Sequence, residues 1–269
     1  MTESRNYRLV RGGGDDVEIP HVLIVGGGYL GMYTAKRLEK KLGFGEARIT
    51  VIDPNSYMTY QPFLPETAAG SISPRHVVVP LRKVFDRVRV LGGRVVRIDH
   101  SERTVRYEPN VGEPETLSYD HLVMAAGAVS RTLPIPGLAE WGIGIKTVEE
   151  AAHLRNHVLN QLTIADSTED EATRRKALNF VFVGGGFAGA EAVAELEDMV
   201  RDAVRVHPSI KQEEVNFYLI EAADKILPEV GPDVGEKALN QMRRRGIDVR
   251  LETFLESAVD ERIKLSDGT

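Results

Sequence analysis

Two stretches of the chain carry the same order of apolar, small and polar positions. VLIVGGGYLGMYTAKRLE occupies residues 22–39, FVFVGGGFAGAEAVAELE occupies residues 180–197, and the two agree at seven of eighteen positions. Each opens with a short apolar run, which is typical of a strand buried on both faces of a parallel sheet. Each then passes through a glycine-rich turn into a helical pattern. The chain is therefore predicted to contain the same strand, turn and helix unit twice.

A second strand is predicted after each unit, and both of these strands end in an acidic residue. RITVID at residues 48–53 ends at Asp53, and VNFYLIE at residues 215–221 ends at Glu221. Between the units lie an extended stretch at residues 89–99, a hairpin-like return at residues 104–109, and LSYDHLVMAAGA at residues 117–128. The last of these ends in Ala126 and Gly127, small residues that let a backbone pass close to a bound pyrophosphate.

The second half of the chain also carries helix start and stop signals. TVEE at residues 147–150 is typical of a capping box and predicts a helix to about Leu162. The basic run at residues 243–245 before Gly246 is typical of a last helical turn with a glycine cap. The polar segment at residues 166–176 is predicted to be a solvated loop or a helix end.

The glycine-rich turns share the spacing G-x-G-x-x-G. The glycines are Gly26, Gly28 and Gly31 in the first copy and Gly184, Gly186 and Gly189 in the second. In this pattern the first glycine permits a sharp turn, the second lets the backbone approach a pyrophosphate, and the third lets helix and strand pack closely. The free N–H groups and the dipole at the helix start then hold the anion. Two complete fingerprints favour two dinucleotide sites; the alternative is that the glycines are only turns of the fold and bind nothing.

The acids at the strand ends refine this prediction. Asp53 follows Gly31 by twenty-two residues, close to the usual interval of about 20. A carboxylate at this place accepts hydrogen bonds from ribose hydroxyls and repels a 2′-phosphate. Glu221 is followed by Ala222 and Ala223, so no arginine stands ready to receive such a phosphate. The second site is therefore predicted to prefer NADH to NADPH.

These elements predict an α/β fold with two Rossmann-like, three-layer dinucleotide-binding domains. Residues 1–20 are polar and glycine-rich and are expected to form a flexible tail. The first domain is predicted at residues 21–132 and the second at residues 142–269, joined by LPIPGLAEW. RIKLSDGT at residues 262–269 has the pattern of a strand and turn with no return strand after it. The second domain is therefore expected to be truncated at its C-terminus.

Composition narrows the classes of function. With 42% hydrophobic and 28% charged residues the chain is typical of a soluble globular protein, and its net charge of -6 argues against nucleic acid as the main partner. No apolar run approaches the roughly 20 residues of a membrane span, so a cytoplasmic location is expected. The 269 residues contain no cysteine, which excludes disulfides, thiolate metal sites and thiol relays. His153 and His157 have no acidic third ligand beside them, so no metal site is predicted.

The motifs follow one another as GxGxxG, an acid-ended strand, YDxLVxAxG and a second GxGxxG. This order resembles that of the two-dinucleotide flavoprotein reductases, which hold FAD in the first unit and NAD(P)H in the second. Within that superfamily the chain resembles the type II NADH dehydrogenases, the single-subunit NADH:quinone oxidoreductases. The residues that carry this resemblance are NSYMTYQPFLPETAAGSISPRHVVVPLRKVF (55–85), GGGFAGAEAVAEL (184–196) and IEAADKILPEV (220–230). Disulfide reductases and sulfide:quinone oxidoreductases share the layout but depend on cysteines, which are absent here.

The resemblance implies an FAD-dependent enzyme that passes hydride from NADH to FAD and then two electrons to a quinone, without thiols or metals. The cofactors carry the hard chemistry, and the protein supplies position and electrostatics. Leu64, Glu66 and the small residues 68–70 fall where the family has a flavin-proximal helix. Contacts to FAD and NADH are expected at the glycines of both fingerprints and at residues around them, namely Tyr29, Leu30, Asp53, Pro54, Val95, Ala126, Gly127, Phe187, Ala188 and Glu221.

Glu191 stands where the first copy has Tyr33, two residues beyond the last glycine. It is expected in the first turn of the second dinucleotide helix. In the family the matching acid is thought to help seat the nicotinamide or to relay protons toward the quinone, so Glu191 is the predicted catalytic residue. The alternative is that an acid in a first helical turn only complements the helix dipole, which contributes about 0.3–1 kcal/mol.

The family normally continues with a final strand of the NAD unit, a second FAD segment, a quinone site and amphipathic helices that rest on the membrane. The resemblance thus implies a quinone partner and, through a C-terminal region absent from these residues, a place on the cytoplasmic face of the cell membrane. It leaves a homodimer open. Two other functions stay open as well: an NADH-dependent reductase for a ferredoxin or another soluble acceptor, and a non-catalytic nucleotide-binding or redox-sensing fragment.

Overall fold

The computed structural model describes residues 19–129 and 132–269, which form two compact units. The first unit comprises residues 19–59 and Val78–Val129, and the second comprises Tyr60–Val77 and residues 132–269. The tail predicted at residues 1–20 lies outside the described residues except for its last two. The domains predicted at 21–132 and 142–269 stay predictions, to which the structure adds that residues 60–77 pack with the second unit.

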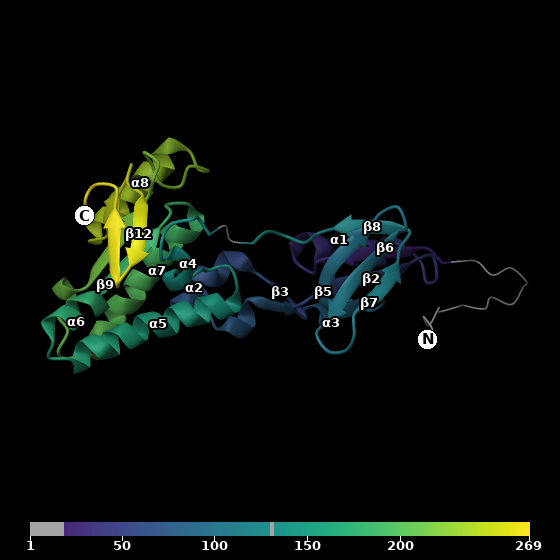
Figure 1. The fold of residues 1–269 in the computed structure, drawn as a ribbon, viewed down its shortest axis with the longest axis horizontal. Helices are drawn as coiled ribbons and strands as arrows, with labels where there is room; N and C mark the ends of the chain where they lie inside the picture. Colours follow the sequence, from purple (N-terminus) through teal and green to yellow (C-terminus); the bar gives the residue numbers. More distant parts are fainter. Residues whose placement is uncertain (1–18, 130–131) are drawn as a thin grey trace, which may run out of the picture. The chain divides into compact units, whose positions relative to one another are not determined.

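The first unit is built on one sheet with the strand order β7-β6-β5-β2-β1-β8 (Figure 1). Strands β5, β2, β1 and β8 run parallel, whereas β6 and β7 extend the sheet as antiparallel neighbours. A short antiparallel ribbon of β3 and β4 accompanies the sheet. The elements are β1 (His21–Val25), α1 (Tyr29–Lys41), β2 (Arg48–Asp53), β3 (Tyr57–Thr59), β4 (Val78–Pro80), α3 (Leu81–Val84), β5 (Arg89–Asp99), β6 (Thr104–Pro109), β7 (Glu115–Ser118) and β8 (His121–Met124).

Strand β1 is covered on both faces, as its continuous apolar run predicts. Every residue of β1 is buried. Val22 and Ile24 pack in one cluster with Met32 of α1, whereas Leu23 packs in another with Tyr107 of β6. Alternate residues of a strand point to opposite faces, so the sheet that contains β1 has side chains packed on both of its faces. The predicted α/β arrangement around a parallel sheet is confirmed here.

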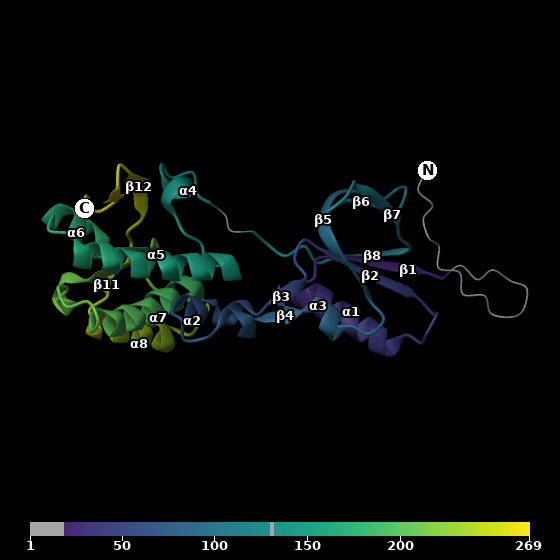
Figure 2. The ribbon, with the colours of Figure 1, turned by 90° about the horizontal axis from the view of Figure 1, so that it is seen from below.

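The second unit contains a parallel sheet with the order β11-β10-β9 and a separate antiparallel pair, β12 and β13. The long helix α5 packs against α7 and the short helix α2 (Figure 2). The elements are η1 (Gln61–Phe63), α2 (Leu64–Ala68), η2 (Pro74–His76), α4 (Leu138–Trp141), α5 (Val148–Ser167), α6 (Glu171–Ala177), β9 (Asn179–Val183), α7 (Phe187–Val204), η3 (Gln212–Glu214), β10 (Asn216–Ile220), α8 (Pro232–Arg244), β11 (Asp248–Arg250), β12 (Leu255–Val259) and β13 (Arg262–Leu265).

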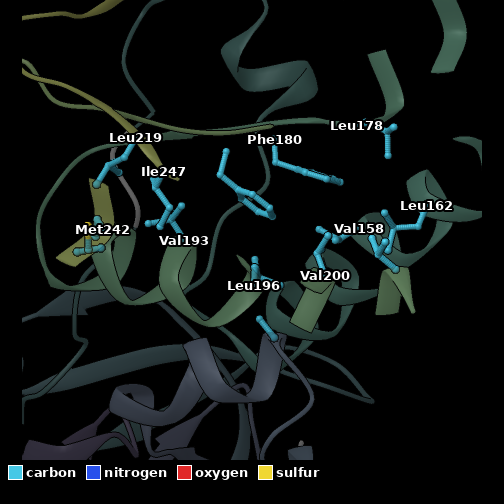
Figure 3. Packing of buried hydrophobic residues seen from close by; sticks show 14 of the residues in the cluster. Val158, Leu162, Leu178, Phe180, Val193, Leu196, Val200, Leu219, Met242 and Ile247 are labelled. Carbon is cyan, nitrogen blue, oxygen red and sulfur yellow. The ribbon is translucent and has the colours of Figure 1, made fainter. Parts of the chain in front are cut away.

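One apolar core holds the second unit together. Figure 3 shows side chains from α5, α7, α8 and the strands gathered in this core, among them Val158, Leu162, Leu178, Phe180, Val193, Leu196, Val200, Leu219, Met242 and Ile247. Leu64 and Ala68 of α2 belong to the same core, and both are almost fully buried. This burial explains why residues 60–77 join the second unit although they lie between strands of the first.

Several local predictions are confirmed and one is corrected. Thr147 and Glu150 form the predicted capping box, and Gly246 has the positive φ, +90°, of a helix-ending glycine. The segment predicted as a loop or helix end instead contains α6, because the Asp170 side chain caps its first turn by accepting from the Thr173 N–H at 2.8 Å. Residues 262–265 form the predicted strand, β13, which pairs with the preceding strand β12.

Candidate functional site

The first glycine turn lies at the carboxyl end of β1 and is termed the first cradle, residues 26–31 with Asp53. Gly26 has a φ of +103°, and its N–H donates to the Ile52 carbonyl oxygen at 2.8 Å. A Cβ on Gly26 would lie 2.1 Å from the Ala125 carbonyl oxygen, and one on Gly31 would lie 1.8 Å from the Gly26 carbonyl oxygen. Backbone atoms cannot move aside as a side chain can, so both positions require glycine.

Gly28, by contrast, faces open space. A Cβ on this residue would meet no atom of the described chain within 4 Å. Gly28 is the N-cap of α1, whose first turn has no acid and whose cap makes no side-chain hydrogen bond. The first N–H groups of a helix have no partner within the helix, so the start of α1 is suited to binding an anion.

Asp53 is fixed beside this turn by two backbone donors. Its Oδ2 accepts from the Gly27 N–H at 2.6 Å, and its Oδ1 accepts from the Asn55 N–H at 2.7 Å. A carboxylate oxygen has more than one acceptor site, so each oxygen can still receive a ribose hydroxyl. The carboxylate is thus held in place before any ligand binds.

The second cradle, residues 184–189 with Glu221, repeats this construction. Gly184 has a φ of +107° and its N–H donates to the Ile220 carbonyl oxygen at 2.8 Å. A Cβ on Gly189 would lie 1.9 Å from the Gly184 carbonyl oxygen. Glu221 accepts from the Gly185 N–H at 2.5 Å and from the Ala223 N–H at 2.7 Å. Both cradles therefore present a free helix start and an anchored carboxylate.

The other residues predicted to contact cofactors surround these turns. Tyr29, Leu30 and Phe187 are exposed apolar side chains in the first turns of α1 and α7, and Ala188 follows Phe187. Ala126 and Gly127 follow β8, whose end lies against Gly26.

Pro54 and Val95 lie on the β2 and β5 side of the first cradle. Pro54 is exposed next to Asp53. Val95 lies on β5 three residues beyond Gly92, the partner of Asp53, and packs against the cluster that contains Tyr107. The residues predicted in each unit thus lie on that unit's glycine turn or on the strands beside it, and their roles as cofactor ligands stay predictions.

The placement of Glu191 in the first turn of its helix is wrong. Because α7 begins at Phe187, before the last glycine of the motif, Glu191 is the fifth helical residue, and the first turn contains no acid. The dipole effect falls off within the first turn. Complementing the dipole is therefore a weaker reason for this acid than the sequence pattern suggested.

Glu191 instead belongs to a carboxylate cluster with Glu66 of α2 and Glu195 of α7. Although the Glu191 side chain is exposed, neighbouring atoms remove part of its hydration, and this desolvation raises its pKa, with further contributions from Glu66 and Glu195. Desolvation and Glu66 also raise the pKa of Glu195. Glu66 Oε2 is buried and has no hydrogen-bond partner among the described residues. Glu195 was missed at the sequence level, although its i,i+4 spacing from Glu191 indicates a shared helix face.

A second repeated acid ties each dinucleotide helix to the segment just before β5 in the first unit and just before β11 in the second. Glu39 and Glu197 end the two matching stretches, and both are buried, at 6% and 4% exposure. Glu39 Oε1 accepts from the Asp86 N–H at 2.9 Å and from the Arg87 N–H, and the Arg87 side chain donates to the Glu39 carbonyl oxygen.

Glu197 pairs with Arg201 and with Arg245, which also donates to the Ala194 carbonyl oxygen at 2.6 Å. Arg87 and Arg245 are themselves 158 residues apart, the spacing of the two copies. The identical glutamates at the ends of both stretches were the sequence signal for this feature.

Comparison with known proteins places the chain in a family. A sequence profile of the pyridine nucleotide-disulphide oxidoreductases matches residues 20–269. The external alternative NAD(P)H-ubiquinone oxidoreductase B3 of Arabidopsis thaliana mitochondria is 34% identical over 254 residues, which cover 90% of this chain and 43% of that protein. A type II NADH:quinone oxidoreductase of Staphylococcus haemolyticus is 30% identical, over 86% of this chain and 56% of its own length. The chain thus spans about half the length of these relatives.

The fold agrees with this placement. NDH2 from Plasmodium falciparum in complex with NADH superposes with a TM-score of 0.84 at 21% identity, covering 93% of this chain and 51% of that one. The predicted resemblance to type II NADH dehydrogenases is confirmed by these relatives. No helix in residues 19–129 or 132–269 is long and apolar enough to cross a membrane. By its profile match over residues 20–269, the chain belongs to the pyridine nucleotide-disulphide oxidoreductase family.

Proposed function

We propose that the chain forms the nucleotide-binding part of an FAD-dependent NADH:quinone oxidoreductase. FAD is assigned to the first cradle, with residues 21–132 as its domain, and NADH to the second, with residues 142–269. The observation that carries the proposal is the presence of two complete cradles, each with a free helix start beside a carboxylate anchored by two backbone donors. The names of the relatives from Staphylococcus haemolyticus and Arabidopsis thaliana support the same activity.

The residues of the first cradle fit a flavin dinucleotide. Gly28 leaves room for a pyrophosphate over the start of α1, and Asp53 presents two oxygens to a ribose. Ala126 and Gly127 supply small residues where a phosphate-bearing chain must pass. When bound, FAD supplies the acceptor for a hydride and the donor of two electrons to a quinone.

The second cradle fits NADH better than NADPH. Because both Glu221 oxygens are held by backbone N–H groups, the carboxylate cannot swing away from a 2′-phosphate without losing two hydrogen bonds. Arg250 lies on the neighbouring strand, but its side chain is engaged by Asp248 and Asp267, each at 3.0 Å. The positive charge of Arg250 is therefore already paired and does not attract a 2′-phosphate. Glu221 then determines the preference for NADH over NADPH.

Glu191 is assigned the handling of a proton near the reacting end of NADH. Its raised pKa means that it keeps a proton to a higher pH than an ordinary glutamate, whose pKa is 4.5. Glu66 and Glu195 raise it by like-charge repulsion, so removing either neighbour makes Glu191 more acidic. The acceptor is proposed to be a quinone, with the protein acting in the cytoplasm or at the cytoplasmic face of the cell membrane.

An anaerobic titration of the FAD-loaded protein tests this function. Addition of NADH should abolish the visible absorbance of the flavin, NADPH should do so poorly, and a quinone should restore it. A protein that retains FAD but shows no change with NADH would contradict the proposed activity. Restoration by ferredoxin but not by a quinone would instead favour a reductase for a soluble acceptor.

A further inference from the structure

One acidic side chain reaches into the second cradle at a place that the first cradle leaves open. A Cβ on Gly186 would lie 3.9 Å from Glu229 Oε1, whereas a Cβ on Gly28 would meet nothing within 4 Å in the described chain. The missing side chain of this second glycine is what makes room for a pyrophosphate. The Glu229 carboxylate therefore lies at the edge of the space that the phosphates of a dinucleotide need.

The backbone that carries Glu229 is fixed to the cradle. Ile226 is buried, and its Cγ2 would lie 2.8 Å from a Cβ on Gly185. The Leu227 N–H donates to the Gly185 carbonyl oxygen at 2.7 Å, and the Val230 N–H donates to the Leu227 carbonyl oxygen at 3.1 Å. The turn that contains Glu229 is therefore tied directly to the glycine loop.

The Glu229 side chain itself is exposed and has no hydrogen bond or ion pair with any described residue. Glu229 Oε1 lies beside the start of α7, whose N-cap Gly186 makes no side-chain hydrogen bond and whose first turn has no acid of its own. A negative charge close to a helix N-terminus is stabilised by the helix dipole. A carboxylate and a pyrophosphate thus compete for the same positive end of the helix.

We propose that Glu229 is an internal competitor for the pyrophosphate of the nucleotide in the second cradle. This inference rests on the proposed function, in which that nucleotide is NADH. The carboxylate lies beside the helix start when the cradle is free, and it repels the phosphates when the nucleotide enters. Glu229 therefore weakens nucleotide binding and speeds release, which suits a substrate that must leave in every turnover. The first cradle, which is assigned a cofactor that stays bound, has no such acid over Gly28.

Calorimetric titration of the FAD-loaded protein with ADP-ribose, which carries the pyrophosphate without the redox ring, tests this inference. Glu229→Gln should bind ADP-ribose about five-fold more tightly at low salt, the ratio expected for one unit charge about 4 Å from another in water. The gain should shrink as salt is added, because exposed charges are screened. Binding of adenosine, which has no phosphate, should be unchanged. Glu236→Gln is the matched control, since it removes the same charge from an exposed position on α8.

Each outcome is decisive. Tighter, salt-dependent binding of ADP-ribose by Glu229→Gln but not by Glu236→Gln supports the competitor. Equal binding by wild type and Glu229→Gln overturns it and leaves the proposed function intact. Weaker binding by the variant also overturns it, since the carboxylate would then contact the nucleotide favourably. If ADP-ribose binds to neither protein while FAD remains bound, the assignment of NADH to the second cradle fails, and the competitor fails with it.

Discussion

The two cradles share their backbone construction and differ in the side chains at their rims. In both, the first and third glycines pack against backbone atoms, and a carboxylate at the end of the second strand is held by two N–H groups. Both helices also carry a buried glutamate that binds an arginine or the backbone near it, at Glu39 and Glu197. The proposed anion binding thus depends on backbone features that the two cradles share.

The two cradles differ in the side chains on the helix and beside the open glycine, where a bound nucleotide would contact them. The fifth residue of the helix is Tyr33 in α1 and Glu191 in α7, and the open glycine is uncovered at Gly28 but approached by Glu229 at Gly186. The second unit therefore has an acid at each of two places, Glu191 on its helix and Glu229 beside its open glycine, where the first unit has none. Under the proposed assignment, the same backbone would bind FAD tightly in the first cradle and NADH more weakly in the second. A few side chains beside the glycine turns would make the difference.

The largest effect is expected from adding a methyl group at the third glycine of either cradle. Gly31→Ala places a Cβ 1.8 Å from a backbone oxygen, and Gly189→Ala places one 1.9 Å from another. Neither oxygen can move without breaking the turn, so each change should cost about 4 kcal/mol, or roughly 1,000-fold in nucleotide binding. Equilibrium dialysis should show that Gly31→Ala loses FAD and keeps ADP-ribose, and that Gly189→Ala does the reverse.

Gly28→Ala is the matched control for this experiment. Its Cβ meets nothing in the described chain, so the thermal stability should match that of the wild type while FAD binding is lost to the incoming pyrophosphate. If Gly31→Ala and Gly189→Ala each weaken both nucleotides equally, the two cradles are not independent sites.

Removing the buried glutamate should destabilise the second unit more than the first. Glu197→Ala removes the buried partner of Arg245 and leaves it only the exposed Asp198 at 2.9 Å, which should cost about 3 kcal/mol. Glu39→Ala leaves two N–H groups unpaired but no buried charge, so about 2 kcal/mol is expected. Hydrogen exchange measured by mass spectrometry on peptides from α7 and α1 checks each unit separately. A larger loss in α1 than in α7 would contradict this account.

Features set by one short segment could be predicted from the sequence, and features set by distant segments could not. Residues 48–53, 89–99 and 104–109 were predicted as strands with the bounds that the structure shows, because their apolar pattern and turn residues lie within them. The approach of Glu66 to Glu191 depends on the packing of α2 on α7, which no local pattern encodes.

The same reason applies to Glu229 and to β13. Glu229 reaches Gly186 through a turn in which Leu227, a residue other than glycine, adopts a φ of +51°. Such a conformation is uncommon and cannot be anticipated from residue type. Likewise, the pairing of β13 with β12 depends on a segment that precedes β13, so the pattern of β13 alone does not encode it.

Glu191→Gln should lower the rate of flavin reduction by NADH about 100-fold, the low end for loss of a positioned proton donor or acceptor, while FAD stays bound. The pKa of Glu191 is raised, so in the wild type its proton is lost only above the pH at which an ordinary glutamate ionises, and quinone turnover should fall as pH rises through that raised pKa. Glu66→Gln removes a repelling charge, lowers the pKa of Glu191 and moves this fall to lower pH. Stopped-flow and steady-state pH profiles check both variants.

Tyr33→Phe is the comparison variant in the first unit, since Tyr33 occupies the same helical position there. It should leave both profiles unchanged. A pH profile that does not move in Glu66→Gln would show that the carboxylate cluster has no part in the reaction.

The smallest effect is expected at the first strand position, which is His21 in one unit and Asn179 in the other. The His21 Nδ1 donates to the Ser118 carbonyl oxygen at 2.6 Å, and Nε2 accepts from the Thr50 hydroxyl at 2.8 Å. Burial and, to a lesser extent, Arg48 lower the pKa of His21 below the ordinary value of 6.5, so the unfolded chain binds the proton more readily than the folded one. The stability of the first unit should therefore fall as pH falls below 6.5.

His21→Asn copies the second unit and should remove this pH dependence, at a cost of about 1 kcal/mol for one buried hydrogen bond at neutral pH. Hydrogen exchange of β1 peptides at two pH values checks the change. If the variant keeps the pH dependence of stability, a titratable group other than His21 causes it.

A crystal structure of the protein soaked with FAD and NADH would show which nucleotide each cradle binds. The account predicts FAD with its pyrophosphate over Gly28 and its ribose on Asp53, and NADH with its pyrophosphate over Gly186 and its ribose on Glu221. Either cradle remaining empty, or the same nucleotide occupying both, would contradict the assignment of two different dinucleotides to the repeated units.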